Sequence, residues 1–256
     1  MRAATELLLG TIPDDVIDGL GAPDRRVITE IWRARAGMER HVAAAFGLVV
    51  RPLVEAGASV ATLDLVSTAV SHEIEHGELC LALAARYAGE PVSAPPLEPV
   101  FVPDFATTDP ALRATLWLIG LSCLNETIAS VRLAAEIEDT SSPTVRRVLT
   151  AIAADETIHA RAGWAHLASP IVGPSVRAEV NRLLPSLVRA SIDGVFAENA
   201  FLEEGYPDHG LPSRGRTMDL VAAALRDVVI PGFTHVGLDS RGVREQAASR
   251  FPNAFT

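Results

Sequence analysis

Apolar residues recur at helical spacing along most of the chain, and capping, proline and glycine residues divide them into helices. The first predicted helix follows Asp24 as its cap and runs through VITEIWRARAGMERHVAAAFGL. Pro52 is expected to end or kink it, because proline cannot continue a helical hydrogen-bond ladder. After a turn, Ser59 caps a second helix that runs to Tyr87, with Gly89 as its stop. The first half of the chain therefore predicts a long helical hairpin.

Two further helices begin with one shared signal, a capping side chain followed by proline at the first helical position. Asp109 precedes a third helix over about 110–138, and Ser142 precedes a fourth over about 143–167. The proline-rich connection at 91–109 is longer than most links between helices. Its length suits a crossover along a helical bundle.

The last third of the chain predicts additional helices. Pro174 starts a fifth helix that runs to about Phe196, and 217–230 has the pattern of a sixth helix before Pro231. The segment between these two helices is expected to be a loop. The tail from Gly237 is expected to be loosely held.

The composition is that of one large globular domain, 48% hydrophobic and 21% charged. Aromatic residues make up only 5%, and with no strand-like alternation this favours helices packed on helices. The predicted fold class is all-α. We expect an N-terminal extension over 1–23, a four-helix core over 24–168, and C-terminal helices over 169–256. Those last helices either cover one side of the core or mediate a homodimer.

Charge and cysteine content narrow the range of partners and compartments. A net charge of −10 argues against nucleic acid, which needs clustered Lys and Arg. Cys80 and Cys123 form no disulfide framework, so a reducing cytoplasm is the expected location. The apolar stretch within residues 1–15 is too short for a secretory signal. Residues 114–131 approach membrane-span length, but the central carboxylate of Glu126 favours a buried core helix in a protein that does not span a membrane.

Two Glu-x-x-His pairs carry the main chemical signal. Glu73 and His76 lie in SHEIEH, and Glu156 and His159 lie in DETIH. Positions i and i+3 share one face of a helix, so each pair can hold one metal ion. Such pairs also arise by chance, and solvated helix faces are the simpler interpretation of each.

A separate glutamate precedes each pair at a similar interval, which strengthens the metal interpretation. Glu39 lies 34 residues before the first pair, and Glu126 lies 30 residues before the second. Each interval suits one helical hairpin, so the metal-binding half-site is repeated. Glu30 and Glu55 are rivals for the role of Glu39. Glu126 lies in a long uncharged run, where a carboxylate is protonated, paired with a cation such as Arg132, or bound to metal.

The stretches EIEHGELC, LNETIAS and DETIHARAGW resemble bacterial ferritin-like proteins of the di-iron carboxylate superfamily. The resemblance covers residues 25–168. It implies a four-helix core that binds two iron ions, or a manganese and an iron ion, in the manner of ferritin-like di-metal bundles. The implied ligands are Glu39, Glu73, His76, Glu126, Glu156 and His159.

One position departs from that superfamily's pattern. In many relatives an aspartate precedes the Glu of each Glu-x-x-His and orients the ligand histidine of the opposite helix. Asp155 fits that role and is expected to reach His76, but the matching residue of the other helix is His72. His159 therefore lacks a carboxylate partner in this reading, which would make the two metal positions unequal. The alternative is that His72 is itself an additional ligand.

Superfamily members include oxygenases, N-oxygenases, desaturases, peroxidases and iron-storage proteins. Phe46, Trp117, Cys123 and Trp164 are candidates to line an apolar cavity, although core packing is the simpler role for each. Tyr87 lies too far along its helix from His76 to store a radical at the metals. Since the chain has no Cys-x-x-Cys iron domain, an external electron donor is expected.

The expected function is that of a di-metal oxidase or oxygenase that uses O₂ to oxidise a small organic substrate. Two alternatives remain open. One is iron handling or peroxide scavenging, and the other is a helical interaction protein without metal.

Overall fold

The computed structural model describes residues 13–100, 105–198 and 203–255. These residues are mostly helical and contain no β-strand, only an isolated bridge between Tyr206 and Leu211. The all-α prediction is confirmed for this part of the chain. The elements are α2 (Asp15–Asp18), α3 (Ala22–Glu55), α4 (Val60–Ala88), α5 (Pro110–Leu118), η1 (Ile119–Glu126), α6 (Thr127–Asp139), α7 (Pro143–Leu167), α8 (Pro174–Glu198), η2 (Pro207–His209), α9 (Arg214–Ala224), η3 (Leu225–Val229), α10 (Ile230–His235), α11 (Arg241–Arg250) and η4 (Pro252–Ala254).

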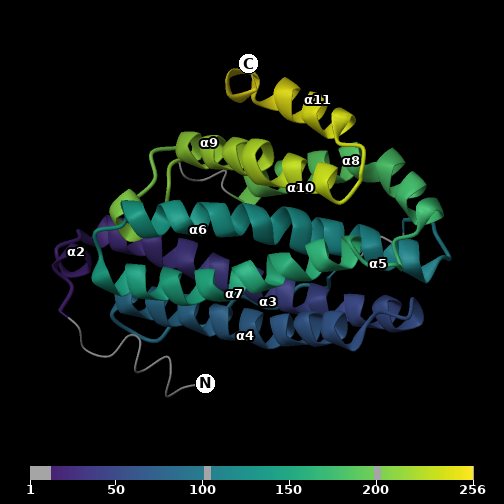
Figure 1. The fold of residues 1–256 in the computed structure, drawn as a ribbon. Coiled ribbons are helices and arrows are strands. Elements are labelled where there is room, and N and C mark those ends of the chain that lie inside the picture. The colour runs from purple at the N-terminus through teal and green to yellow at the C-terminus, as the bar shows by residue number, and fades with distance from the viewer. Residues whose placement is uncertain (1–12, 101–104, 199–202, 256) are drawn as a thin grey trace.

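Four long helical segments lie side by side (Figure 1): α3, α4, the continuous α5–η1–α6 segment, and α7. Helices α8, α9 and α10 cover the α5–η1–α6 segment, and α11 lies on α8. The predicted C-terminal cover is therefore present within one chain, and the homodimer stays a prediction.

Several predicted boundaries are confirmed because their capping groups make the expected contacts. The side chains of Ser59, Asp109 and Ser142 each accept a backbone N–H from the first turn of the following helix, at 2.9–3.1 Å. Gly89 ends α4 with φ of 76°, in the left-handed region that favours glycine. Local capping chemistry thus sets where these helices begin and end.

For the first helix, the predicted cap is wrong, and of the two outcomes predicted for Pro52, a helix end or a kink, the helix end is wrong. Asp24 lies inside the first turn rather than at the cap, since α3 begins at Ala22 after Gly21, which makes no side-chain cap. Pro23 allows this start because its fixed φ suits the first helical turn. Pro52 does not stop the helix, which continues to Glu55. A proline this close to the C-terminal end of a helix removes only one of the last intrahelical hydrogen bonds.

The third predicted helix is one rod, but its centre is not α-helical. Between α5 and α6, the eight residues Ile119–Glu126 form a π-helix. Apolar spacing does not predict this change, because π-turns have no strong sequence signature. The segment ends at Glu126, and π-turns within helices are frequent at functional sites.

The sixth predicted helix is longer at both ends than expected. It begins at Arg214, where the Ser213 hydroxyl accepts the Arg216 N–H at 3.2 Å, and it passes beyond Pro231 to His235. A π-helix, η3, ends at Val229, two residues before Pro231. Its wider turn gives the proline ring room that a regular α-turn lacks.

The tail was expected to be loosely held, and this prediction is wrong. Residues Arg241–Arg250 form α11, which packs against α8. Val243 and Ala247 are fully buried, and Phe251 continues the same four-residue spacing. The apolar contacts of this otherwise polar helix come from three positions. So few apolar residues do not give a clear helical pattern in the sequence.

The connection between α4 and α5 follows α3. The Ser93 carbonyl accepts a hydrogen bond from Arg33 at 2.9 Å, and Pro95 lies against Gly37, where an added Cβ would come within 2.9 Å of its ring. Residues 101–104 of this connection lie outside the described part. The described part supports the predicted crossover, since it runs along α3 rather than turning back directly.

The apolar core of the described residues falls into three clusters. One, around Trp32, Leu83 and Ile152, fills one end of the four long segments, and another, around Phe46 and Leu118, fills the other. The third joins the α5–η1–α6 segment to the C-terminal helices. Along α3, α4 and α7, buried polar residues lie between the first two clusters.

One segment, Pro110–Asp139, is long and apolar enough to cross a membrane, but 67% of its most apolar window is buried inside the protein. This burial favours a core helix over a membrane span, as was predicted from the position of Glu126 within the segment.

The residues before α3 dock on the start of α7. The Asp14 carboxylate accepts hydrogen bonds from the Ser142 hydroxyl at 2.6 Å, the Thr144 N–H at 3.1 Å and the Ile17 N–H at 3.2 Å. Burial alone would raise the pKa of Asp14, but these hydrogen bonds outweigh it and lower the pKa. The predicted absence of a signal peptide concerns mainly residues 1–12, which lie outside the described part.

We expect Asp14→Asn to lower the free energy of unfolding by about 1–3 kcal/mol at neutral pH, because buried donors lose their carboxylate acceptor. The lowered pKa means that Asp14 stabilises the fold above its unfolded pKa and that this contribution is lost as pH falls through the folded value. Urea unfolding should therefore show a difference in unfolding free energy between Asp14→Asn and the wild type that becomes smaller at acidic pH. Asp15→Asn, at an exposed site in the same helix, is the control. Equal stabilities at pH 7 would contradict the prediction.

Candidate metal centre

The six predicted ligands converge from four helical segments. Within the described residues, their ligand atoms form two groups, each with all atoms within 4.8 Å of one another. The Glu39 group contains Glu39, Glu73, His76 and Glu156, and the Glu126 group contains Glu73, Glu126, Glu156 and His159. Each group is large enough to hold a metal ion. The two groups overlap in two carboxylates.

The shared carboxylates face both imidazoles. His159 Nδ1 lies 2.9 Å from Glu73 Oε1 and 2.9 Å from Glu156 Oε2. His76 Nδ1 lies 3.5 Å from Glu73 Oε2 and 3.4 Å from Glu156 Oε1. Each of these glutamates thus presents one oxygen to each histidine, which suits carboxylates that bridge two ions. The two imidazole centroids are 5.8 Å apart.

The other two carboxylates each belong to one group. Glu126 ends the π-helix and is 4% exposed, and the Glu39 side chain is 12% exposed on α3. The rivals of Glu39 lie elsewhere, because Glu30 and Glu55 are exposed and pair with nearby arginines. Glu39 and Glu126 therefore each belong to one group only, whereas Glu73 and Glu156 belong to both.

Buried polar atoms without hydrogen-bond partners show that the centre fits cations. They include both carboxylate oxygens of Glu73, Oε1 of Glu126 and Nδ1 of His76. Leaving such groups buried without a partner costs several kcal/mol in free energy. Two divalent ions would satisfy these atoms and balance four carboxylates in charge. A solvated helix face, the simpler alternative for each pair, does not describe groups that are almost completely buried.

In the absence of ions, the site retains protons. Burial alone would lower the pKa of His76 and His159, but the adjacent carboxylates of Glu156 and Glu73 outweigh it and raise these pKa values to about 11 and about 9. Burial, followed by repulsion from Glu73, raises the pKa of Glu39 to about 8. Burial and the neighbouring carboxylates also raise the pKa of Glu126. Metal binding must displace these protons, so metal affinity should fall with decreasing pH.

The outer nitrogens of the two histidines meet different partners. His76 Nε2 lies 3.2 Å from Asp155 Oδ2, the contact expected from the sequence. His159 Nε2 lies 3.3 Å from His72 Nδ1, which is itself 3.4 Å from Asp155 Oδ1. Among the described residues, the carboxylates in contact with His159 are those of the two shared glutamates, on its inner side. His72 belongs to neither group of ligand atoms in the described residues, so its role as an additional ligand is not supported.

A buried ion-pair network lies behind Glu39. Arg35 contacts Glu39 at 3.5 Å and Glu136 at 3.2 Å, and Arg132 contacts Glu136 at 3.3 Å. Arg132 therefore pairs with Glu136, not with Glu126 as one alternative proposed. This network was not predicted from the sequence, although Arg35 with Glu39 and Arg132 with Glu136 have the i,i+4 spacing of helical ion pairs.

The predicted cavity residues fall in different places. Phe46 is fully buried, with its ring centroid 5.7 Å from that of His159, so it forms an apolar wall beside the site. Trp117 and Cys123 are also buried among core residues. None of these three lines the groove described below. Only Trp164 does so.

Tyr87 is not at the site. Its hydroxyl shares a hydrogen bond of 2.8 Å with His209 Nδ1. This agrees with the expectation that Tyr87 cannot serve the metals. His166, which burial holds at a pKa of about 4, shares a 3.0 Å hydrogen bond with the Thr115 hydroxyl. Both histidines are thus part of the packed structure.

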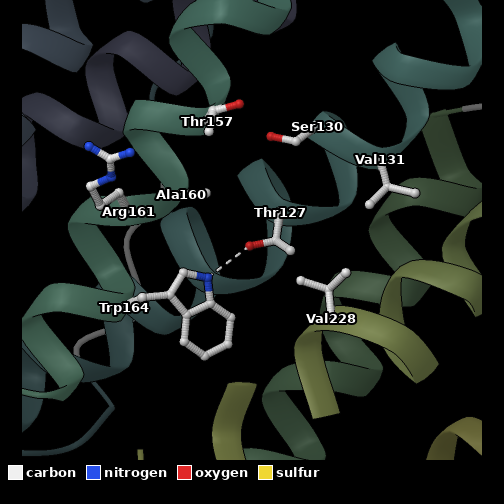
Figure 2. Close-up of a pocket in the computed structure, with 8 residues that line it drawn as sticks. All are labelled: Thr127, Ser130, Val131, Thr157, Ala160, Arg161, Trp164 and Val228. Atoms are coloured by element: carbon white, nitrogen blue, oxygen red, sulfur yellow. Dashed lines mark hydrogen bonds between the residues drawn. The ribbon is translucent and has the colours of Figure 1, made fainter. Parts of the chain in front are cut away.

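A groove of about 360 Å³ lies between α6, α7 and η3 (Figure 2), and none of the six candidate ligands is among its lining residues. Its lining residues are Thr127, Ser130, Val131, Thr157, Ala160, Arg161, Trp164 and Val228. Three of them directly follow predicted ligands in sequence: Thr127, Thr157 and Ala160. The groove therefore lies on the helix faces adjacent to those that carry Glu126, Glu156 and His159.

Comparison of the chain with protein-family models, with curated proteins and with solved structures found no match. The description of this protein therefore depends on its own residues and their geometry.

Proposed function

We propose that this chain is a ferritin-like di-metal carboxylate protein that uses O₂ to oxidise a small organic molecule. The observation that carries the proposal is the pair of overlapping ligand groups, in which Glu73 and Glu156 face both histidines. Four helical segments supply the groups, as in ferritin-like di-metal bundles. The buried oxygens without partners argue against the alternative of a metal-free interaction protein.

The donor set favours iron, with a manganese and iron pair as the alternative. Carboxylate oxygens and imidazole nitrogens suit Fe(II) and Mn(II), whereas no thiolate belongs to either group in the described residues. Burial raises the pKa of both the Cys80 and Cys123 thiols, which disfavours a thiolate ligand further. When bound, the two metals would supply the electrons that reduce O₂.

The protein's own residues would hold the ions and keep water away. Glu39 and Glu126 would bind one ion each, and Glu73 and Glu156 would bridge them. The histidines would bind through Nδ1, because their Nε2 atoms face Asp155 and His72. Phe46 closes the site on the His159 side, so access by water is limited there.

The groove, which Arg161 also lines, supports a small and largely apolar substrate. The Trp164 indole donates to the Thr127 hydroxyl at 3.1 Å, and Val131 and Val228 form other walls (Figure 2). The hydroxyls of Ser130 and Thr157 donate to carbonyls of their own helices, so each oxygen can still accept a hydrogen bond. A ligand with one O–H or N–H donor fits this lining. The volume is near the lower end of the range for small-molecule sites.

Filling the groove should block small-molecule binding without removing metal. We expect Val228→Phe to lower the affinity for phenol, used as a probe, by about 10-fold or more, because the larger ring occupies the apolar space. Ligand-observed NMR measures the affinity. Val60→Phe, at a fully exposed position on α4, is the control. Unchanged phenol affinity in Val228→Phe would remove the groove from the proposal.

The reaction with O₂ tests the proposed enzymatic function. Protein loaded anaerobically with Fe(II) should consume O₂ and change its optical spectrum, then return to Fe(II) when an external electron donor is added. Progressive storage of iron beyond two ions per chain, or rapid turnover of peroxide with no organic oxidation, would favour iron handling or peroxide scavenging instead.

A further inference from the structure

The two proposed ion positions differ in the hydrogen-bond partner of the outer ring nitrogen, Nε2, of their histidines. On one side Asp155, a carboxylate, contacts His76 at 3.2 Å, and on the other side His72, an imidazole, contacts His159 at 3.3 Å. A hydrogen bond from a ligand histidine to a carboxylate orients the ring and increases its basicity. A neutral acceptor provides a weaker hydrogen bond than an ionised one.

The proton positions around His72 increase this difference. When His159 Nδ1 binds an ion, its Nε2 must carry the proton and donate it outward. The nearest acceptor is His72 Nδ1, which then cannot donate to Asp155 Oδ1 at 3.4 Å. An ion bound to the Glu126 group, which contains His159, therefore prevents the hydrogen bond that His72 could otherwise donate to Asp155. Filling the other position leaves the His76–Asp155 hydrogen bond intact.

Arg35 should lower the metal affinity of the Glu39 group, because its positive charge competes with an ion for the Glu39 carboxylate. Its contact with Glu39 is 3.5 Å, however, and its shorter contact, 3.2 Å, is with the almost fully buried Glu136. Glu136 also pairs with Arg132 at 3.3 Å, so it balances only part of the Arg35 charge. Substitutions at His72 leave Arg35 and Glu39 unchanged, so a comparison of two such variants isolates the effect of the outer partner.

We propose that the Glu39 group binds its ion more tightly than the Glu126 group, and that His72 is the positioning residue that makes the second ion the weaker one. This inference rests on the proposed di-metal site. By the usual effect of such outer partners, the affinities should differ by about 10–100-fold. The chain would fill in order, with the Glu126 position filled last.

The test is a titration with Mn²⁺ followed by EPR spectroscopy, in which a single bound ion and a coupled pair give different spectra. At one equivalent, two equal independent positions would leave about half of the chains with a single ion. A 100-fold difference would raise that share to about four-fifths. We expect the wild type to show the higher share.

His72→Asp and His72→Asn form a matched pair of variants. Both place an oxygen where His72 Nδ1 lies, because each of these atoms is bonded to Cγ, but only aspartate is charged. His72→Asp should tighten the second ion about 10–100-fold and lower the single-ion share, whereas His72→Asn should behave like the wild type. His72 is partly exposed, at 24% for its side chain, so both variants should fold.

Asp155→Asn is an independent test, since it should weaken the first ion by a similar factor. Glu75→Gln, exposed on the same helix as His72, should change nothing. Equal binding curves for His72→Asp and His72→Asn, with two ions still bound, would overturn the inference and leave the di-metal site standing. A wild type that binds no Mn²⁺ or Fe(II) would overturn both.

Discussion

Replacing Glu73 with glutamine should remove both ions from the protein. Glu73 belongs to both ligand groups and presents one oxygen to each histidine. An amide keeps the shape of the side chain but loses the charge that bridges two cations. Since removal of an outer partner already costs about 10–100-fold in metal affinity, loss of a bridging ligand should cost more than about 100-fold at each position. Metal analysis of the purified variant measures this.

Two comparisons show whether Glu73 acts as a ligand. Glu39→Gln should lose mainly one ion, because Glu39 belongs to one group only. The metal-free form of Glu73→Gln should remain folded, because the amide fills the same space as the carboxylate and still contacts His159 and His76. A variant that keeps both ions, or one that is unfolded without metal, would show that Glu73 is structural.

Gly163→Ala should destabilise the protein and weaken the ion of the Glu126 group. A Cβ at Gly163 would lie 2.7 Å from Cys123 Sγ, 2.7 Å from Ser122 Cβ and 2.9 Å from the Leu118 carbonyl oxygen. These atoms belong to the helical segment that carries Glu126, so α7 could no longer approach it as closely. Overpacking of this kind costs about 1–3 kcal/mol. Urea unfolding and metal analysis should both reveal the change.

Gly120→Ala is the matched control, because nothing lies within 4 Å of a Cβ at that position. Replacing a helical glycine without a clash usually stabilises by about 0.5–1 kcal/mol. The two substitutions should therefore change the free energy of unfolding in opposite directions. If both stabilise the protein and leave two ions bound, the close contact between α7 and η1 does not position Glu126.

The clustering of the six candidate ligands could largely be predicted from the sequence, because it depends on local spacing. Glu-x-x-His pairs place two side chains on one helical face, and capping residues such as Ser142 fix where the rods begin. A hairpin-length interval then brings each pair opposite a separate glutamate. These spacings and caps depend on residues close together in the sequence, so a single sequence is enough to predict them.

Features that depend on packing between distant segments were missed. The π-helix before Glu126 has no strong pattern, and α11 is held by three buried apolar residues in a polar stretch. The groove needs Val228 from the C-terminal helices beside Thr157 from α7, 71 positions apart in sequence. That His72 would meet His159 across two helices also could not be read from spacing alone.

The centre also shows how buried charge is accommodated in this fold. Apolar clusters lie on both sides of the ligands along the four segments, so water cannot easily satisfy the acidic groups. Protons on the histidines and on Glu39 partly neutralise them without metal. Two divalent ions would neutralise them more completely, which makes metal content the direct test.

Metal content per chain decides whether the di-metal centre exists. Elemental analysis measures it on protein purified without added metal and again after anaerobic Fe(II) loading. The geometry predicts about two ions per chain after loading, one for each ligand group, and fewer in Glu126→Ala. Protein that holds no iron or manganese under either condition, with its helices intact, would contradict the di-metal centre.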